Sequence, residues 1–548
     1  MNYFPALACG IAASVGILSH VLYFIRGEHH KQAMLYLQMF AASIPLSTLV
    51  LVRFVHFSYG QAILHATGMV GSFLAGLWTS MIIYRAFFHR LNRFHGPWYL
   101  KLTKFTSFIS LWRLDGFRKT YKWHQKHGNI VRTGPNELSI SSPSAPTVIL
   151  GPRSQCIKSP WYDYATYQDL ESLHSTRDVA THEARRRVWD RGFSIKALGD
   201  YEARVTGYTH ELLHAISTFS GHPMNASAWF NYFSFDVMGD FAFGKSFNML
   251  KTSRKHFAIA WLESSTILLG LCSPIPWAIP IGAISPYIGS NFRRFVRWCA
   301  EQVDERRDSE PKVPDVTSWL LKAKGAADRD DIEATKWLHG DSRLLIVAGS
   351  DTVAIVLTHL FYHLAADPTL VEKLREELTP LMTRGDGEGF HVRDVQHAKF
   401  LNAVINETMR MHPPVPSGVF RTTPKEGIVV DGVAIPGRVN VTVPFYVIGR
   451  SEECFVRPDE FIPERWIGRT ELVREKDAFA PFSLGPYGCI GKQLALMEMR
   501  TVVSLLTSRF DIRLAPGEDG SKLLEESRDA FTLRMEDLSL VFEERKGV

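Results

Sequence analysis

The N-terminal part of the chain differs in pattern from the rest. Residues 4–25, 33–52 and 62–84 are three apolar runs without a charged side chain, and each is long enough to cross a bilayer as a helix. No basic residue precedes the first run and two more runs follow it, so a cleaved signal peptide is disfavoured. We expect three transmembrane helices, with two crossings as the alternative because Pro45 and Gln38 weaken the second run.

Basic residues orient these helices in the membrane. They flank the first loop and follow the third run (Arg26, Lys31, Arg85, Arg90, Arg93), whereas the second loop offers only Arg53. Positive charge favours the cytosolic side. The sequence therefore predicts a membrane anchor over residues 1–95 and, from the hinge at Gly96-Pro97 onward, a main domain over 96–548 that faces the cytosol.

Beyond the anchor, helical periodicity predominates. It recurs at 185–220, 230–270, 335–365, 367–383, 395–411 and 490–509. Short runs at 130–132, 427–430 and 440–443 predict strands, and the prolines at 274–280 predict a loop. The expected fold is one mainly α-helical domain with small β-sheets, preceded by the transmembrane helices.

Composition excludes several classes of function. The 548 residues carry 62 lysines and arginines against 56 acidic residues, without a dense basic block, so nucleic-acid binding is not indicated. The six cysteines show no CxxC spacing, which predicts neither a disulfide framework nor a zinc site. No GxGxxG follows a strand, so the chain is not expected to bind NADPH or flavin itself.

The most informative segment is 481–491, PFSLGPYGCIG, which precedes a helical pattern. We expect Gly485, Gly488 and Gly491 to adopt positive φ in a tight loop whose amides point at Cys489, with Phe482 packed beside the sulfur. These amides and the dipole of the following helix favour a thiolate. The segment suits a haem iron ligand; the alternative is a buried cysteine beside a glycine-rich turn.

A second motif, Ala348-Gly349-Ser350-Asp351-Thr352, lies in the apolar stretch 344–360 and is expected to break up a buried helix. Gly349 costs a helix about 1 kcal/mol relative to alanine, which a groove for O2 would justify. Thr352 and Asp351 are then candidates to deliver protons to O2. The alternative is a local hydrogen-bonding cluster at a helix contact.

The third motif pairs Glu407 with Arg410, three residues apart on one helix face. The neighbouring residues are apolar and Pro413-Pro414 ends the helix, so we expect a buried ion pair that needs another partner. Arg465, in the later segment 461–466, is the candidate third member. Such a triad would have a structural role.

Taken in order, 348–352, Glu407 with Arg410, 461–466 and 482–491 resemble the oxygen-groove, ExxR, PERF-type and haem-loop motifs of the cytochrome P450 family. The resemblance covers roughly residues 97–545. Segments 229–240 and 243–247 look most like fungal microsomal members of secondary metabolism. The resemblance implies a haem b cofactor with Cys489 as the axial iron ligand.

One position departs from the family pattern. An arginine that binds a haem propionate usually stands two residues before the cysteine, where this chain has Tyr487. A phenol donates a hydrogen bond but carries no charge. The resemblance offers His182 and Arg186, with the family's four-residue spacing although histidine replaces tryptophan, and Arg421 as the remaining propionate ligands.

The resemblance implies a monooxygenase that inserts one oxygen atom of O2 into a bulky apolar terpenoid, polyketide or alkaloid. Electrons would come from an NADPH-cytochrome P450 reductase in the endoplasmic reticulum membrane, with cytochrome b5 as a further candidate donor and Lys492 as a candidate docking residue. The aromatic segment 161–167 and the region around Trp277 are expected near the substrate. A haem-thiolate isomerase or dehydratase and a non-catalytic haem-binding membrane protein are the alternatives; Thr352 argues against the former.

Overall fold

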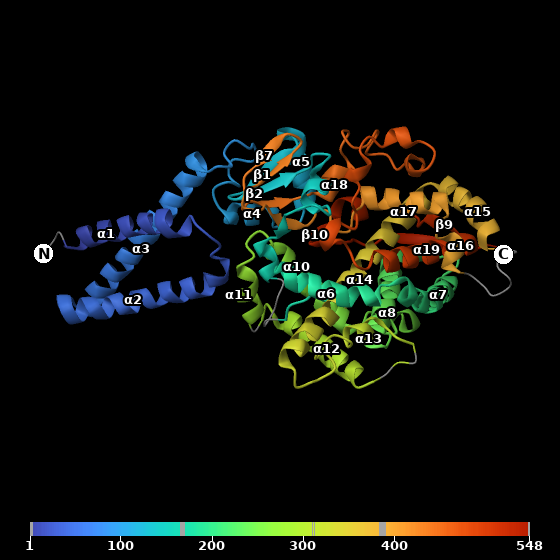
Figure 1. The fold of residues 1–548 in the computed structure, drawn as a ribbon, viewed down its shortest axis with the longest axis horizontal. Helices are drawn as coiled ribbons and strands as arrows, with labels where there is room; N and C mark the ends of the chain where they lie inside the picture. Colours follow the sequence, from blue (N-terminus) through green and yellow to red (C-terminus); the bar gives the residue numbers. More distant parts are fainter. Residues whose placement is uncertain are drawn as a thin grey trace.

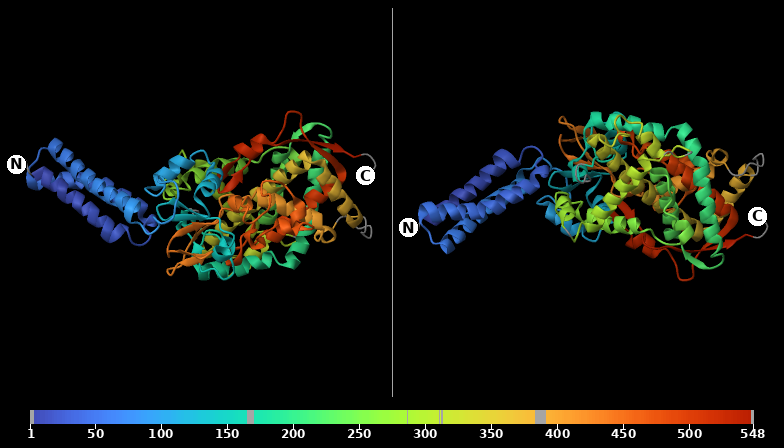
Figure 2. Two further views of the ribbon diagram at one scale, coloured as in Figure 1. Left: turned by 90° about the horizontal axis from the view of Figure 1, so that it is seen from above. Right: turned by 90° about the horizontal axis from the view of Figure 1, so that it is seen from below.

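The computed structural model describes residues 4–164, 170–285, 287–309, 311, 313–382 and 391–545. The N-terminal helices project as a separate bundle from the main domain (Figure 1, Figure 2). The bundle consists of α1 (Phe4–Ser19) continued by η1 (His20–Phe24), α2 (Ala33–Val55), and α3 (Tyr59–Ile83) continued by η3 (Tyr84–Phe88). All three helices are long and apolar enough to cross a membrane, and α2 runs without interruption through Pro45.

Small residues let the anchor helices touch. A side chain at Gly16 of α1 would collide with the backbone of Phe73 in α3, and one at Gly76 of α3 would collide with the backbone of Ala13. Close backbone approach through glycine is a usual way for helices to associate in lipid, where burial of apolar surface supplies no driving force. The bundle is therefore built for a membrane rather than for water.

The main domain is mostly helical. Its helices are α4 (Lys104–Leu111), α5 (Gly116–His127), α6 (Val179–Gly192), α7 (Ile195–Ser217), α8 (Ala226–Phe243), α9 (Met249–Thr252), α10 (Phe257–Cys272), α11 (Ala278–Ile284), α12 (Ser290–Arg307), α13 (Val316–Leu320), α14 (Ile332–Ala366), α15 (Pro368–Met382), α16 (Val392–Val395), α17 (Lys399–Met411), α18 (Phe445–Gly449) and α19 (Lys492–Arg509). Short π- and 3₁₀-helices link them: η2 (His30–Gln32), η4 (Pro146–Leu150), η5 (Pro160–Tyr164), η6 (Pro463–Trp466), η7 (Thr470–Leu472), η8 (Lys476–Ala478), η9 (Gly485–Tyr487) and η10 (Lys522–Glu526).

The strands form small sheets. They are β1 (Ile130–Gly134), β2 (Glu137–Ile140), β3 (Ile157–Lys158), β4 (Pro223–Asn225), β5 (Phe420–Thr422), β6 (Ile428–Val430), β7 (Val433–Ile435), β8 (Asn440–Thr442), β9 (Phe510–Leu514), β10 (Arg528–Ala530), β11 (Thr532–Arg534) and β12 (Ser539–Glu544). The largest sheet has the order β1-β2-β8-β5-β3; β4-β12-β9 form a second, and β6-β7 and β10-β11 pair separately.

The long helix α14 runs through the centre of the main domain (Figure 1). Although it is apolar enough to span a membrane, two thirds of its most apolar window is buried by the surrounding protein. It packs against α8, α12, α17 and α19. Helix α14 is thus the core helix against which the candidate site is assembled.

Several expected boundaries were wrong. The pattern at 185–220 is two helices, because Ser194 caps α7 by accepting from the Ala197 amide at 3.4 Å. The pattern at 230–270 is three helices, since α8 ends at Gly244 with φ +67°. The predicted loop at 274–280 contains the start of α11. Side-chain periodicity continues across such breaks, whereas local capping decides where the backbone turns.

Candidate active site

The Cys489 loop lies between η9 and α19. The Cys489 amide donates to the Phe482 carbonyl at 2.8 Å, and the amides of Gly491 and Lys492 donate to its sulfur. Only Gly485 has the expected positive φ, +62°, where a Cβ would lie 2.6 Å from the Gly151 carbonyl oxygen. The expectation was wrong for Gly488 (φ −62°) and Gly491 (φ −79°), which have ordinary backbone angles.

The Cys489 side chain remains accessible, yet the atoms around it raise the pKa of the thiol by desolvation. The amides of Gly491 and Lys492 and the charge of Arg186 offset this rise only in part. The protein groups alone therefore do not lower the pKa of this thiol, and the expected thiolate stays a prediction for the haem-bound protein. A bound metal ion deprotonates a coordinating thiol outright. The loop therefore positions the Cys489 thiol, and a bound metal ion would ionise it.

The motif 348–352 lies within α14, which is unbroken there, so the expected helix break was wrong. Ala348 is exposed and Thr352 half-buried along a helix that is otherwise largely buried. The Thr352 hydroxyl donates to the Ala348 carbonyl at 2.9 Å. A Cβ at Gly349 would lie 2.6 Å from Met238 of α8, which gives this glycine a packing role; its part in an oxygen groove stays a prediction.

Asp351 is placed to titrate near neutrality. Burial and then the charge of Glu263 raise the pKa of its carboxyl, Arg534 and Lys255 oppose the rise, and together they bring the pKa to about 7. An acid with a pKa near the working pH is suited to proton transfer. The arrangement is compatible with the predicted roles of Asp351 and Thr352, which stay predictions.

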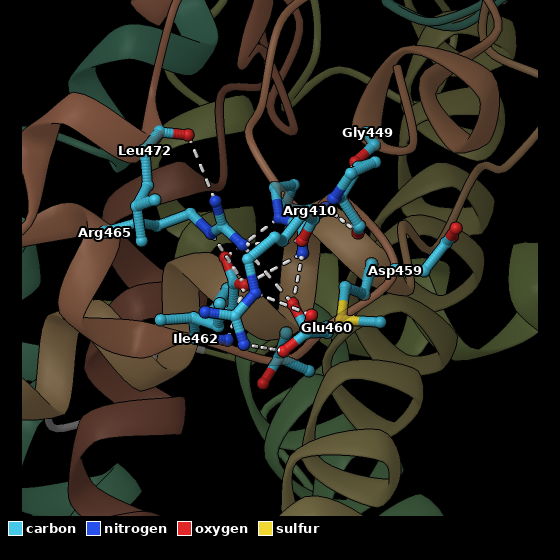
Figure 3. A network of polar contacts seen from close by, with 12 residues as sticks. Arg410, Gly449, Asp459, Glu460, Ile462, Arg465 and Leu472 are labelled. Carbon is cyan, nitrogen blue, oxygen red and sulfur yellow. Dashed lines mark hydrogen bonds and ion pairs between the residues drawn. The ribbon is translucent and has the colours of Figure 1, made fainter. Parts of the chain in front are cut away.

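Arg410 and Arg465 lie close together in a buried network (Figure 3), and both form ion pairs with Glu407. The carboxylate of Glu407 accepts from Arg410 Nε at 2.9 Å and Nη2 at 2.8 Å, and from Arg465 Nε at 2.9 Å. The Trp466 indole and the Ile462 amide donate to it, each at 2.9 Å. The remaining guanidinium hydrogens reach backbone carbonyls of residues 449–472. The network joins α17 to the segment that leads into the cysteine loop.

A second group of buried cations surrounds Tyr487. Lys158 Nζ lies 5.2 Å and Arg421 Cζ 4.9 Å from the centre of its ring, and the His182 ring lies 4.6 Å away. Lys158 and Arg421 are 4 % and 2 % exposed and stand opposite each other in the β3–β5 pair. Like charges facing each other across strands destabilise a sheet.

Among the described residues, neither Lys158 nor Arg421 has an ion-pair partner. Lys158 donates to the Leu173 carbonyl at 2.7 Å, and Arg421 Nη1 donates to the Phe420 carbonyl at 3.0 Å while its Nε has no acceptor. Burial and then Arg421 lower the pKa of Lys158 strongly; burial and then Lys158 lower that of His182 to about 3. Buried charges are normally paired, so this group is suited to bind an anion.

Arg186, on α6, reaches the cysteine loop instead. Its Nη1 donates to the Gly488 carbonyl at 2.6 Å and its Nε to Asp190 at 2.9 Å. The sequence thus singled out three of the four basic side chains around Tyr487 and the loop, and missed Lys158. Lys158 belongs to no sequence motif. It becomes a candidate ligand only because β3 pairs with β5 and places it opposite Arg421.

The comparisons with known proteins agree with this geometry. The family model for cytochrome P450 matches residues 105–542. The chain is a cytochrome P450. It is 40% identical over 543 residues to cytochrome P450 monooxygenase notG' of Aspergillus versicolor, covering 98% of each chain, and 37% identical to tryprostatin B 6-hydroxylase of Neosartorya fischeri, covering 98% of this chain and 99% of that one. The cytochrome P450DA haem domain shares the fold, with TM-score 0.66 and 16% identity over 79% of this chain and 94% of that one.

These findings confirm the predicted fold, the haem-thiolate cofactor and the monooxygenase class, with relatives among fungal enzymes as expected. A cytochrome P450 monooxygenase uses O2 and a redox partner that supplies electrons. The three apolar N-terminal helices are long and apolar enough to cross a membrane, which is compatible with membrane anchoring. The roles of the individual site residues stay predictions.

An aromatic wall lies close to the cation group of this cytochrome P450. Trp161 stacks on Phe531 with ring centres 4.9 Å apart and lies 5.0 Å from the Phe420 ring. Phe531 has φ +83°, unusual for an aromatic residue. The expected aromatic segment 161–167 is described only as far as Tyr164; its remaining residues lie outside the described ones.

Proposed function

We propose that the protein binds haem b with Cys489 as the axial ligand. This proposal rests on Lys158 and Arg421, which have no carboxylate partner among the described residues. Two buried like charges opposite each other need anions to balance them. The two propionates of haem b supply that charge, with His182 and Arg186 as further partners. When bound, a thiolate-ligated haem supplies the oxygen-activating chemistry.

Thr352 and Asp351 would hold and deliver protons, and the accessible surface of α14 at Ala348 would leave room for O2. The substrate proposed is a bulky apolar secondary metabolite, since Trp161, Phe420 and Phe531 offer flat aromatic surfaces. Tryprostatin B, which appears in the name of one relative, is the first compound to test. Terpenoids, polyketides and other alkaloids follow.

The electron donor proposed is a membrane-bound NADPH-cytochrome P450 reductase, with cytochrome b5 as a second donor. Lys492 is exposed three residues after Cys489, and such a charge suits an acidic partner surface. We place the enzyme in the endoplasmic reticulum membrane with three crossings and the catalytic domain in the cytosol. An isomerase or dehydratase would turn over without NADPH.

The test is the reduced carbon monoxide difference spectrum of microsomes that contain the protein. Wild type and the control Cys272→Ala should both show the strongly red-shifted Soret band of thiolate-ligated haem, and Cys489→Ala should lose it. A retained band in Cys489→Ala, or a band typical of histidine ligation in wild type, would overturn the assignment. NADPH-dependent oxidation of tryprostatin B or of a panel compound then tests the monooxygenase role.

A further inference from the structure

The loop between the first two anchor helices contacts the catalytic domain through charged side chains. Glu28, His30 and Lys31 of the loop meet Asp163 and Arg177 of the domain; we call these five residues the anchor clamp. Asp163 lies 2.6 Å from His30 Nε2 and 3.1 Å from Lys31 Nζ. Arg177 binds Asp163 at 2.6 Å and both oxygens of Glu28 at 3.0 and 3.1 Å.

Asp163 is the centre of the anchor clamp, and its side chain is 13% exposed. Burial alone would raise the pKa of its carboxyl, but the hydrogen bond from His30 and the charge of Arg177 outweigh it and lower the pKa to about 2. Glu28, His30 and Asp163 are close enough to share a metal ion. Arg177 and Lys31 already neutralise the carboxylates, so we assign the cluster to ion pairing.

The anchor clamp joins the membrane anchor to the aromatic wall. Asp163 belongs to η5, the short helix that also carries Trp161 and Tyr164, and the His30 ring lies edge-on to Tyr164 at 5.5 Å. Trp161 is held further by its indole, which donates to Ser273 at 2.9 Å. A shift of the anchor loop would therefore move Asp163 and, through η5, Trp161 of the aromatic wall.

A cavity of about 1350 Å³ lies between the anchor and the catalytic domain. The anchor contributes Phe24 and Tyr84 to its lining, and the domain contributes Trp161, Phe420 and Phe531. Successive strand residues face opposite sides, so Phe420 faces this cavity while its neighbour Arg421 belongs to the cation group around Tyr487. The cavity is thus separated by one strand from the proposed haem site.

We propose that the anchor clamp holds the first anchor loop against the catalytic domain, so that the anchor forms one wall of this cavity and controls how bulky apolar substrates enter it. The anchor loop is then a positioning element for Trp161, and the enzyme's selection of substrates depends on the anchor as well as on the catalytic domain. The role of the cavity in substrate entry rests on the proposed haem enzyme, whereas the docking of the anchor loop does not. Docking requires residues 26–31 to lie on the same side of the membrane as the catalytic domain.

The first test is trypsin cleavage of the full chain in sealed microsomes, followed through an N-terminal epitope tag. Arg26 and Lys31 are trypsin sites that the anchor clamp should protect. Asp163→Asn and Glu28→Gln should each raise the rate of cleavage at these sites, Asp163→Asn by about tenfold if it weakens docking by about 1.4 kcal/mol. Glu305→Gln, which breaks the exposed pair with Lys245, should leave the rate unchanged.

Two results would overturn the proposed docking. One is equal cleavage in wild type, Asp163→Asn and Glu28→Gln. The other is cleavage only after detergent opens the microsomes, which would place the loop across the membrane from the catalytic domain. Glu28→Gln changes a residue of the anchor loop that is half exposed, so it keeps the test open if Asp163→Asn fails to fold.

The second test uses clotrimazole as a bulky iron ligand and imidazole as a small one. Stopped-flow association of clotrimazole should accelerate in Asp163→Asn and Glu28→Gln by the factor seen for trypsin cleavage, because one opening equilibrium controls both. Imidazole association should not change. If cleavage rises and clotrimazole association stays constant, the anchor clamp exists but does not shape the entrance. If the carbon monoxide band is missing from wild type, the haem proposal fails while the trypsin result still stands.

Discussion

Replacing Lys158 by methionine should produce two effects of opposite sign. In the haem-free protein the Lys158 amine is buried, the Leu173 carbonyl is its only acceptor among the described residues, and burial and Arg421 hold its pKa far below the usual value. Methionine has a similar shape and needs no partner. We therefore expect Lys158→Met to leave the free energy of unfolding of the haem-free protein unchanged or to raise it.

In the haem-bound protein the same change removes a proposed partner of a propionate. A hydrogen bond to a charged group contributes about 1.5–3 kcal/mol, so haem should dissociate about 10 to 150 times faster. Transfer of haem to excess apomyoglobin, followed by loss of the thiolate carbon monoxide band, measures this rate. Lys158→Arg should retain haem like wild type, and Lys126→Met, at an exposed lysine of α5, is the matched control.

Two outcomes would refute this reasoning. Unchanged haem dissociation in Lys158→Met would mean that Lys158 does not face a propionate. Marked destabilisation of the haem-free variant would mean that the amine has a stabilising role within the protein alone. The reduction potential gives an independent reading, because removing a cation near the haem should favour the oxidised iron and lower the potential.

Four further predictions concern other parts of the enzyme. Glu407→Ala leaves Arg410 and Arg465 buried without a counter-charge and should cost about 3–5 kcal/mol, seen as earlier thermal loss of the carbon monoxide band, whereas Glu305→Gln should have little effect; equal melting would contradict the network's role. Thr352→Ala should keep bound haem but divert NADPH electrons to hydrogen peroxide, and fully coupled turnover would remove Thr352 from the proton pathway. Asp351→Asn should remove a pH-rate inflection near the carboxyl's pKa of about 7; persistence of the inflection would assign it elsewhere. Burial lowers the pKa of His359 to about 4 and that of His363 to about 3. The free energy of unfolding should therefore be unaffected by these groups above the unfolded pKa of about 6.5 and should fall as the pH drops toward the folded values. In acid unfolding, His359→Leu should make that fall less steep.

The sequence predicted the parts of the site that lie within short segments. The spacing of Glu407 and Arg410 places both on one helix face, and the apolar residues around them indicate burial, which is what the structure has. Cys489 was identifiable because glycines and an aromatic residue surround it within eleven positions. Such segments fold under local rules of spacing, capping and backbone freedom.

The parts that sequence reasoning missed depend on contacts between distant segments. Lys158 becomes a candidate ligand only because β3 pairs with β5, which puts it opposite Arg421. The packing of Gly349 against Met238 requires α8 to cross α14. The pKa of Cys489 also depends on the packed domain, because the sequence shows the amides that favour a thiolate but not the desolvation by surrounding atoms that opposes it. Desolvation is a property of the packed domain, and no local pattern reports it.

Tyr487 offers the sharpest test of how this cytochrome P450 holds its haem. Lys158 Nζ lies 5.2 Å and Arg421 Cζ 4.9 Å from the centre of the phenol ring, so Tyr487→Arg would place a third cation close to two others. Repulsion among buried like charges should destabilise that single variant when haem is absent. In the double variant Lys158→Met/Tyr487→Arg the number of cations returns to that of wild type, and haem retention should recover relative to Lys158→Met. Because either single change alters one charge and the pair restores it, recovery would show that the position of the cation is exchangeable between strand β3 and the cysteine loop. If the double variant loses haem as fast as Lys158→Met, the arginine at 487 does not reach the anion that Lys158 serves, and the two positions bind haem independently.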